Sequence, residues 1–307
     1  MIYLAISYVC NQKCTFCPCG TLKQQREFLP LSEIYDFIEK NADIEDRHII
    51  ISGGEPTLHP NFTEIIKLFQ KEHYRITILT TSERFSDLNF TNRFLKIWDP
   101  SGIKVITTLH SQSKEEHEHT NGTSGSFERS IAGVKNVAAY GCIAVVKHCI
   151  TRANYKDLNK FYHFVNQVFP QQINIQFCSI DYCGIDDQNQ EQEFVSFPMM
   201  KEYLEDMFDA YMSDLRDKRT MRRLYCINMP LCAAEPIYWQ FLQKNSAHYA
   251  AHISPNSSGN LQVNYNVKDI VSISEMYCQN CLVKNICAGT YCSAFDIYGE
   301  RLIVPYQ

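Results

Sequence analysis

The sequence has no excess of positive charge. It contains 29 Lys and Arg residues against 34 Asp and Glu, which gives a formal net charge of −5. Its basic runs are short pairs such as Lys218-Arg219 and Arg222-Arg223. Because proteins bind nucleic-acid phosphates through a basic stripe or patch, we expect no nucleic-acid partner.

Long apolar runs are also missing. The start of the chain shows no basic segment followed by an apolar one, as in a signal peptide, and no run approaches the length of a membrane span. We therefore expect a cytoplasmic protein without a membrane partner.

Cysteine, in contrast, is abundant, with 14 in 307 residues. This is well below the density of a small disulfide scaffold, and the cysteines gather near the two ends of the chain in short spacings. Metal ligation explains that distribution better than disulfides do.

The first cysteine group is Cys10-Asn-Gln-Lys-Cys14-Thr-Phe16-Cys17, directly after an apolar run. Three thiols so close together cannot all pair, and they are one short of the four that close an iron–sulfur cube or a structural zinc site. A metal held there would keep one open position. A zinc loop or a chance group of buried thiols is the plainer alternative.

This C-x3-C-x2-C spacing, with an aromatic residue before the third Cys, resembles the cluster loop of radical SAM enzymes. In that family three thiolates hold a [4Fe-4S] cluster, S-adenosylmethionine (SAM) binds the fourth iron, and reductive cleavage of SAM gives a 5'-deoxyadenosyl radical. The resemblance implies that Cys10, Cys14 and Cys17 are the ligands. It also implies that Phe16 packs against the adenine or shields the cluster, with ordinary core packing as the alternative.

A second motif is Ser52-Gly53-Gly54-Glu55-Pro56-Thr57, which follows an expected strand. The two glycines let the backbone approach a ligand without a Cβ in the way, although alone they would indicate only a tight turn. Downstream of the three-Cys loop, Gly53, Gly54, Glu55 and Pro56 resemble the GGEP element that contacts the SAM amino group.

Apolar β-branched runs alternate with amphipathic runs along the first two thirds of the chain. The expected strands are Ile2–Ser7, His48–Ser52, Arg75–Thr80, Lys104–Leu109, Ile143–Ile150 and Ile173–Phe177. The expected helices are Leu31–Asn41, Phe62–Lys71, Leu88–Trp98, Phe127–Tyr140, Tyr155–Phe169 and Met199–Leu215.

Six such units predict a parallel sheet with helices outside, and strands apolar on both faces suit either a barrel or a doubly wound sheet. The family resemblance favours an α/β fold that is a partial (β/α)6 TIM-type barrel. We expect a radical SAM core domain at residues 1–220 and a small Cys-rich auxiliary iron–sulfur region at residues 221–307.

Polar residues at the end of the fourth strand match positions that contact SAM in related enzymes: Thr108, His110 and Ser111. Lys147 on the fifth strand is a candidate cation for the SAM carboxylate, with a structural snorkelling lysine as the alternative. His117 and His119, set among glutamates before Gly122, are interpreted as a solvated loop face.

The second cysteine group contains one C-x2-C unit, whereas zinc ribbons use two. The C-x2-C-x5-C run with an upstream Cys instead resembles the SPASM or twitch extension of peptide-modifying radical SAM enzymes. This implies one auxiliary [4Fe-4S] cluster held by Cys232, Cys278, Cys281 and Cys287. Cys226 or Cys292 are substitute ligands, and a zinc site is the alternative.

The remaining thiols near the ends of the last strands are Cys149, Cys178 and Cys183. A thiol at the barrel mouth can return a hydrogen atom to a substrate radical, and Cys178 and Cys183 are the candidates for that role. Inert buried cysteine is the alternative for all three, and for Cys19.

The resemblance implies a radical SAM enzyme that abstracts a hydrogen from a ribosomally made precursor peptide, similar to the His-Xaa-Ser system radical SAM maturases. The alternatives are a small-molecule enzyme resembling the molybdenum-cofactor cyclase, and a zinc protein without catalysis. Expected partners are the precursor peptide and a flavodoxin or ferredoxin. Since nine residues precede Cys10, a leader peptide would be held by the barrel, the C-terminal region or a partner protein.

Overall fold

The fold is built on one main sheet, in a computed structural model that describes residues 1–20, 28–40, 45–95, 99–243, 251–255, 261–263 and 270–307. Its strand order is β7-β6-β5-β4-β3-β2-β1-β8-β9, parallel throughout except for the last pair. The strands are β1 Ile2–Ser7, β2 His48–Gly53, β3 Arg75–Thr80, β4 Ile103–Thr108, β5 Ile143–Cys149, β6 Asn174–Cys178, β7 Leu224–Ile227, β8 Ala251–Pro255 and β9 Leu261–Val263. A small antiparallel pair, β10 Val271–Ser272 and β11 Thr290–Tyr291, lies apart.

Helices connect these strands. They are α1 Leu31–Lys40, α2 Phe62–Lys71, α3 Leu88–Leu95, α4 Lys114–Asn121, α5 Ser126–Ala139, α6 Leu158–Val168, α7 Asp187–Glu193, α8 Phe197–Arg216 and α9 Cys292–Tyr298. All six expected strands and all six expected helices are present, with ends shifted by at most three residues where they can be compared. Asn41 and Trp98, expected at helix ends, lie outside the described residues.

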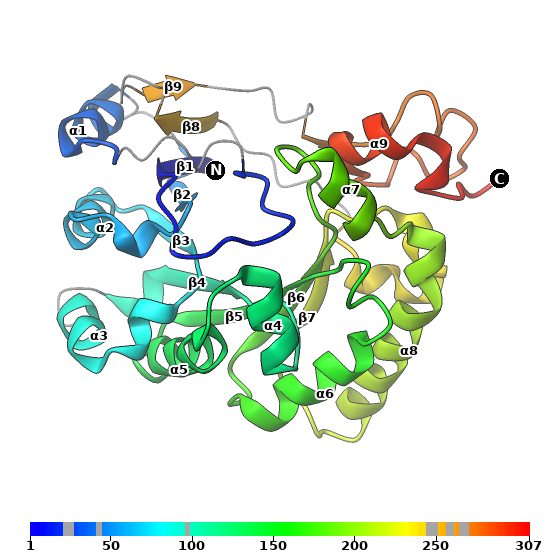
Figure 1. The fold of residues 1–307 in the computed structure, drawn as a ribbon, viewed down its shortest axis with the longest axis horizontal. Helices are drawn as coiled ribbons and strands as arrows, with labels where there is room; N and C mark the ends of the chain where they lie inside the picture. Colours follow the sequence, from blue (N-terminus) through cyan, green and yellow to red (C-terminus); the bar gives the residue numbers. More distant parts are fainter. Residues whose placement is uncertain (21–27, 41–44, 96–98, 244–250, 256–260, 264–269) are drawn as a thin grey trace.

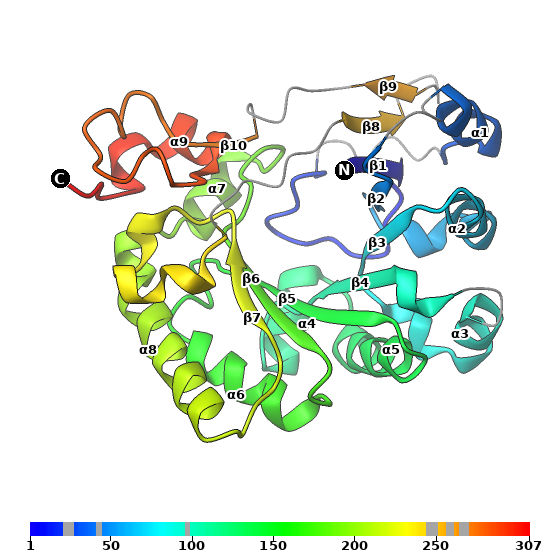
Figure 2. The same ribbon diagram turned by 180° about the vertical axis from the view of Figure 1, so that it is seen from behind.

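Strands β1 to β7 are neighbours in sequence order, so each βα unit adds to the same edge of the sheet. Because β-α-β crossovers are right-handed, successive units place their helices on one side and the sheet curls. Figures 1 and 2 show the helices along the outer side of this curved sheet. The expected partial (β/α)6 TIM-type barrel is confirmed, with β7 as a further parallel strand.

The two faces of the sheet differ in chemistry. The outer face packs fully buried side chains such as Ile51, Ile78 and Val146 against the helices, and this alternation sets the strand register. The inner face mixes buried apolar side chains, such as Ile50 and Val145, with polar ones. Its hydrogen-bonded pairs are Tyr3 with Ser52 (2.8 Å), His48 with Thr77 (2.9 Å) and Lys104 with Tyr225 (3.2 Å). The strands thus carry buried apolar side chains on both faces, and the polar pairs are an addition on the face that lines the barrel.

The C-terminal segment 270–307 packs over the ends of β6 and β7. Ser293 donates to Asp181 (2.6 Å), and Tyr298 stacks on Phe194 at 3.8 Å between ring centroids. Figure 1 shows the segment, orange to red, beside α7. The boundary at residue 220 stays a prediction, since β7, β8 and β9 from beyond it join the main sheet. Among the described residues, no helix is long and apolar enough to cross a bilayer.

Candidate active site

The loop with Cys10, Cys14 and Cys17 starts where β1 ends, and the double glycine after β2 fixes that start. The Gly54 amide donates to the Ser7 carbonyl (2.8 Å), and the Glu55 amide to the Val9 carbonyl (2.8 Å). A Cβ on Gly54 would lie 2.3 Å from the Val9 carbonyl oxygen. Gly53 has φ +120°, and a Cβ on it would lie 2.0 Å from the Ser7 carbonyl oxygen. The glycines are thus required for two backbones to approach one another.

Glu83 anchors the middle of the Cys loop. Glu83 is 6% exposed. One oxygen of its carboxylate accepts hydrogen bonds from the side-chain amides of Asn11 and Gln12 (2.8 Å each). On the other oxygen it accepts Nε (2.8 Å) and Nη2 (2.6 Å) of Arg129. A charge-assisted pair of this geometry is stronger and more directional than neutral hydrogen bonds, so the segment between Cys10 and Cys14 is held in place.

Helix α4 holds the second half of the loop. The amides of Lys13 (2.8 Å) and Thr15 (3.1 Å) donate to the carbonyls of Asn121 and Thr120. These carbonyls lie in the last turn of α4, where helix groups lack an intrahelical partner. The prediction that residues Lys114–Asn121 form a loop is wrong. Ser113 caps the start of this stretch and Gly122, with φ +63°, its end, so it forms a helix.

His110 and His117 lie behind the cysteines. The Nε2 atom of His110 is 3.7 Å from the Cys14 sulfur, and the Phe16 ring meets His110 edge-on at 5.2 Å between centroids. The His110 amide donates to Nδ1 of His117 (3.1 Å). His117 is fully buried, and burial lowers its pKa to about 4. The prediction that His117 belongs to a solvated face is therefore wrong, whereas His119 is exposed as expected.

Two of the side chains expected to position SAM already have protein partners. The Glu55 carboxylate, 1% exposed, accepts from the Thr57 and Thr81 amides and from the Thr57 and Thr80 hydroxyls, at 2.5–3.0 Å. Ser111 donates to Glu116 (2.5 Å). Pro56 begins a buried 3-10 turn, and Thr108 ends β4. Glu55 therefore shapes the loop, and Nδ1 of His110 is a buried polar atom without a partner in the described residues.

Lys147 lies on the inner face of the barrel with two thiols. Cys149 lies two residues further along β5, and Cys149 stands in register with Cys178 on β6. The two sulfurs are 3.5 Å apart. The Cys149 and Cys178 thiols hold the pKa of Lys147 well above its usual range. Cys183, the second expected hydrogen donor, is exposed on the loop after β6.

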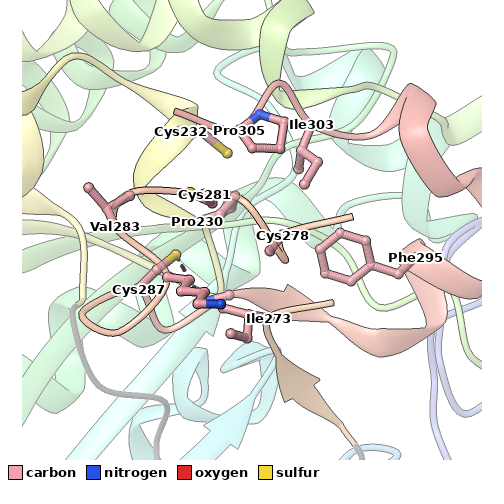
Figure 3. Close-up of a pocket in the computed structure, with 12 residues that line it drawn as sticks. Pro230, Cys232, Ile273, Cys278, Cys281, Val283, Cys287, Phe295, Ile303 and Pro305 are labelled. Atoms are coloured by element: carbon pink, nitrogen blue, oxygen red, sulfur yellow. Dashed lines mark hydrogen bonds between the residues drawn. The ribbon is translucent and has the colours of Figure 1, made fainter. Parts of the chain in front are cut away.

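The four expected auxiliary ligands meet in one pocket beside the barrel. Cys232, Cys278, Cys281 and Cys287 line it together with apolar side chains that include Ile273, Val283, Phe295 and Ile303. In Figure 3, Cys232 approaches this space from one segment, and Cys278, Cys281 and Cys287 approach it from a second. Burial, with the neighbouring Cys287, Cys278 and Cys281 thiols, raises the pKa of Cys232 to about 12. Thiols in an apolar pocket suit iron–sulfur or zinc binding.

All 14 cysteines lie in the described residues and none forms a disulfide. Among those residues, no three His, Cys, Asp or Glu side chains already stand at metal-binding spacing. The donor chemistry still fits an iron–sulfur cluster in both places: three thiols on one loop beside an unpartnered buried imidazole nitrogen, and four thiols around one apolar pocket. The ligand sets stay predictions.

A partial parallel barrel with a three-thiol loop after its first strand defines the class of protein. The family described as "Radical SAM superfamily" matches residues 4–165, more than half of the chain, so the chain belongs to that superfamily. Membership implies a [4Fe-4S] cluster and SAM.

Curated relatives and solved structures are consistent with this assignment. The chain is 26% identical over 157 residues to the mycofactocin maturase MftC of Mycobacterium tuberculosis, covering 51% of this chain and 39% of that protein. It is 24% identical over 205 residues to the GTP 3',8-cyclase of Photorhabdus laumondii, covering 66% of this chain and 61% of that protein. The chain thus spans less than two thirds of either relative.

The fold also resembles SuiB of Streptococcus suis bound to S-adenosylmethionine. The TM-score is 0.65 at 15% identity, over 96% of this chain and 73% of that one. At this low sequence identity, the likeness shows only that the two chains share a fold.

Three features of the site escaped the sequence reasoning. Glu83 lies 66 residues beyond Cys17, in the 3-10 turn Glu83–Ser86. His117 stands among charged residues, and the contact between Cys149 and Cys178 joins two separate strands. The register of β5 and β6 was the available signal for the last, because both cysteines end their strands.

Proposed function

We propose that the chain is a peptide maturase that abstracts a hydrogen atom from a residue of a ribosomally made precursor peptide. The observation that carries this proposal is the four-thiol pocket next to the barrel end, which matches the auxiliary-cluster extension of peptide-modifying radical SAM enzymes. The likeness to a mycofactocin maturase, and to SuiB, which has been solved with its precursor peptide SuiA, supports it.

In this proposal Cys10, Cys14 and Cys17 hold a [4Fe-4S] cluster. With SAM bound, that cluster would supply the electron that cleaves SAM into methionine and a 5'-deoxyadenosyl radical. The Gly53-Gly54-Glu55-Pro56 turn keeps the start of the Cys loop in place and presents backbone groups to SAM. His110 covers Cys14 and offers its unpartnered Nδ1 atom, with Thr108 and Ser111 nearby on the chain.

Lys147 supplies a positive charge inside the barrel, for a SAM carboxylate or for the adjoining thiols. Cys232, Cys278, Cys281 and Cys287 hold one auxiliary [4Fe-4S] cluster, with zinc as the alternative metal. A flavodoxin or ferredoxin supplies electrons. The barrel, the C-terminal region or a partner protein holds the leader peptide.

The test is a triple substitution of Cys10, Cys14 and Cys17 by Ala. We expect it to abolish 5'-deoxyadenosine formation from SAM and dithionite under anaerobic conditions, as measured by liquid chromatography. Incubating the unchanged enzyme with a candidate peptide from the neighbouring genomic region should change the mass or the retention of that peptide. Persistent SAM cleavage by the triple variant would contradict the assignment of these cysteines as ligands of the SAM-cleaving cluster.

A second candidate is a small-molecule enzyme resembling the molybdenum-cofactor cyclase, favoured by the likeness to GTP 3',8-cyclases over two thirds of the chain. In that enzyme the second cluster leaves an iron open for a nucleotide, which requires three cysteine ligands. The pocket here is lined by four cysteines. A change in the EPR spectrum of the auxiliary cluster on adding GTP would favour the cyclase-like function over the peptide maturase.

A further inference from the structure

Cys149 and Cys178 form a thiol pair inside the barrel. They end adjacent parallel strands, stand in register and place their sulfurs 3.5 Å apart. Neighbouring strands lie roughly 4.8 Å apart, which falls within the approximate 4.4–6.8 Å Cα window of disulfides. Cys149 is 7% exposed and Cys178 is 1% exposed, so both side chains are buried where their strands end. The pair is therefore close enough to form a bond between its sulfurs without moving the strands.

The surroundings favour one proton shared by the two sulfurs. The Cys178 thiol donates to the Cys149 sulfur, and that hydrogen bond, together with the Lys147 ammonium, lowers the pKa of Cys149. The hydrogen bond to Cys149, together with burial, raises the pKa of Cys178, so its thiol keeps its proton. Tyr3 and Tyr291 also face Lys147. An S–H beside a thiolate and an ammonium is a different chemical unit from an isolated buried cysteine.

The pair is also linked to the Cys loop. The Asn154 side-chain amide donates to the carbonyls of both His110 (3.1 Å) and Cys149 (2.9 Å). His110 in turn lies against Cys14. The ends of β4 and β5, which carry these groups, lie next to one another at the edge of the barrel where chemistry occurs in such folds.

We propose that the Cys149–Cys178 pair, charge-balanced by Lys147, returns one hydrogen atom to the substrate carbon radical, so that the modified residue keeps its mass and changes its configuration. This rests on the proposed function. The substrate radical takes the hydrogen atom of the Cys178 S–H, and the resulting thiyl bonds to the Cys149 thiolate as a disulfide radical anion. That anion gives one electron to the oxidised flavin or iron–sulfur electron carrier and becomes a disulfide, which an external dithiol reduces again.

The first test needs no peptide. Reduced, cluster-loaded enzyme is treated anaerobically with the thiol oxidant diamide, quenched with iodoacetamide and digested for mass spectrometry. We expect a cross-linked peptide joining Cys149 and Cys178, while the buried Cys142, which has no thiol partner in the described residues, is alkylated only after unfolding. Failure of Cys149 and Cys178 to cross-link would overturn the proposal.

The second test uses the candidate precursor peptide with SAM, reduced flavodoxin and dithiothreitol in D2O, so that flavodoxin oxidised during SAM cleavage is present to accept the electron of the disulfide radical anion. We expect one solvent deuterium per modified residue. Cys178→Ser should lower labelled product per 5'-deoxyadenosine at least tenfold, because an O–H bond is too strong to yield a hydrogen atom to a carbon radical. Cys149→Ser should also lower it, because no thiolate is then left to capture the Cys178 thiyl. Cys142→Ser is the matched control and should keep the wild-type ratio.

Product without solvent deuterium, or full labelling in either serine variant, would overturn the role of the pair while leaving the peptide maturase intact. Absence of any product from the unchanged enzyme would instead count against the proposed function, and the diamide test then decides whether the thiol pair is redox-active. Cluster absorbance near 400 nm verifies that each variant is folded and loaded.

Discussion

Replacing Glu83 should loosen the Cys loop, because this one buried carboxylate joins Asn11 and Gln12 to Arg129. Glu83→Gln keeps one acceptor oxygen for the two loop amides but faces Arg129 with an amide. That loses a charge-assisted pair, and Arg129 is 43% exposed, so water compensates in part. We expect the free energy of unfolding to fall by about 1–2 kcal/mol.

Glu83→Ala removes all four hydrogen bonds. Gln12 is only 5% exposed, so the loss of this acceptor for its side-chain amide adds a desolvation cost. We expect a total loss of about 2–5 kcal/mol. Because the residues next to Cys10 and Cys14 are then free to move, bound iron per chain and 5'-deoxyadenosine formed per bound iron should both fall, more in the Ala than in the Gln variant.

The assay is anaerobic urea unfolding with iron analysis of the same samples. Glu128→Gln is the matched control, since Glu128 pairs with Lys114 on the surface with 58% of its side chain exposed. Loss of this exposed pair should leave the free energy of unfolding nearly unchanged. A Glu83→Ala variant as stable as the control, or one that is less stable but forms 5'-deoxyadenosine at the wild-type rate per iron, would refute the anchoring role.

Three further changes test separate parts of the structure. Gly54→Ala should lower 5'-deoxyadenosine formation at least tenfold, since its Cβ meets the Val9 oxygen at 2.3 Å, whereas Gly102→Ala, with open space around it, should have no effect. His148 is buried and neutral, with its pKa lowered to about 4 by burial, so its contribution to stability is complete above its unfolded pKa and is lost as the pH falls toward 4. His148→Phe should therefore remove about 2 kcal/mol of the stability difference between pH 7 and pH 5, measured by urea unfolding, and an unchanged difference would contradict this. Cys281→Ser should reduce bound iron by the content of one cluster, and equal iron in variant and wild type would exclude Cys281 as a ligand.

The barrel could be predicted from the sequence because its strands obey local rules. Runs such as Ile2–Ser7 and Arg75–Thr80 have the β-branched, apolar character of buried strands, and amphipathic helices separate them. The polar pairs on the inner face were not predicted. Inner residues such as Lys104 and Tyr225 satisfy one another across the barrel, and pairing between residues 121 positions apart leaves no local pattern.

The cysteine motifs could likewise be predicted, since ligand spacing is a local property. The contacts that hold the Cys loop in place could not, because Glu83 and Asn121 reach it only after the chain has folded. Helix α4 was missed for a related reason. Its mostly charged sequence gives little amphipathic signal, and its stability comes from caps at Ser113 and Gly122 and from the buried faces of His117 and Asn121.

Asn154 explains why the chemistry of the Cys loop and that of the inner thiols belong to one site. Its side chain is 7% exposed, accepts from the Thr151 amide (2.8 Å) and donates to the carbonyls of His110 and Cys149. A buried amide with all these bonds satisfied has one orientation, because rotating it would leave polar groups unpaired. The ends of β4 and β5 are thereby fastened together. In the proposed mechanism, a radical formed next to the Cys loop and the thiol at the end of β5 would therefore keep a fixed relation, and a substrate carbon between them would be approached from two set directions.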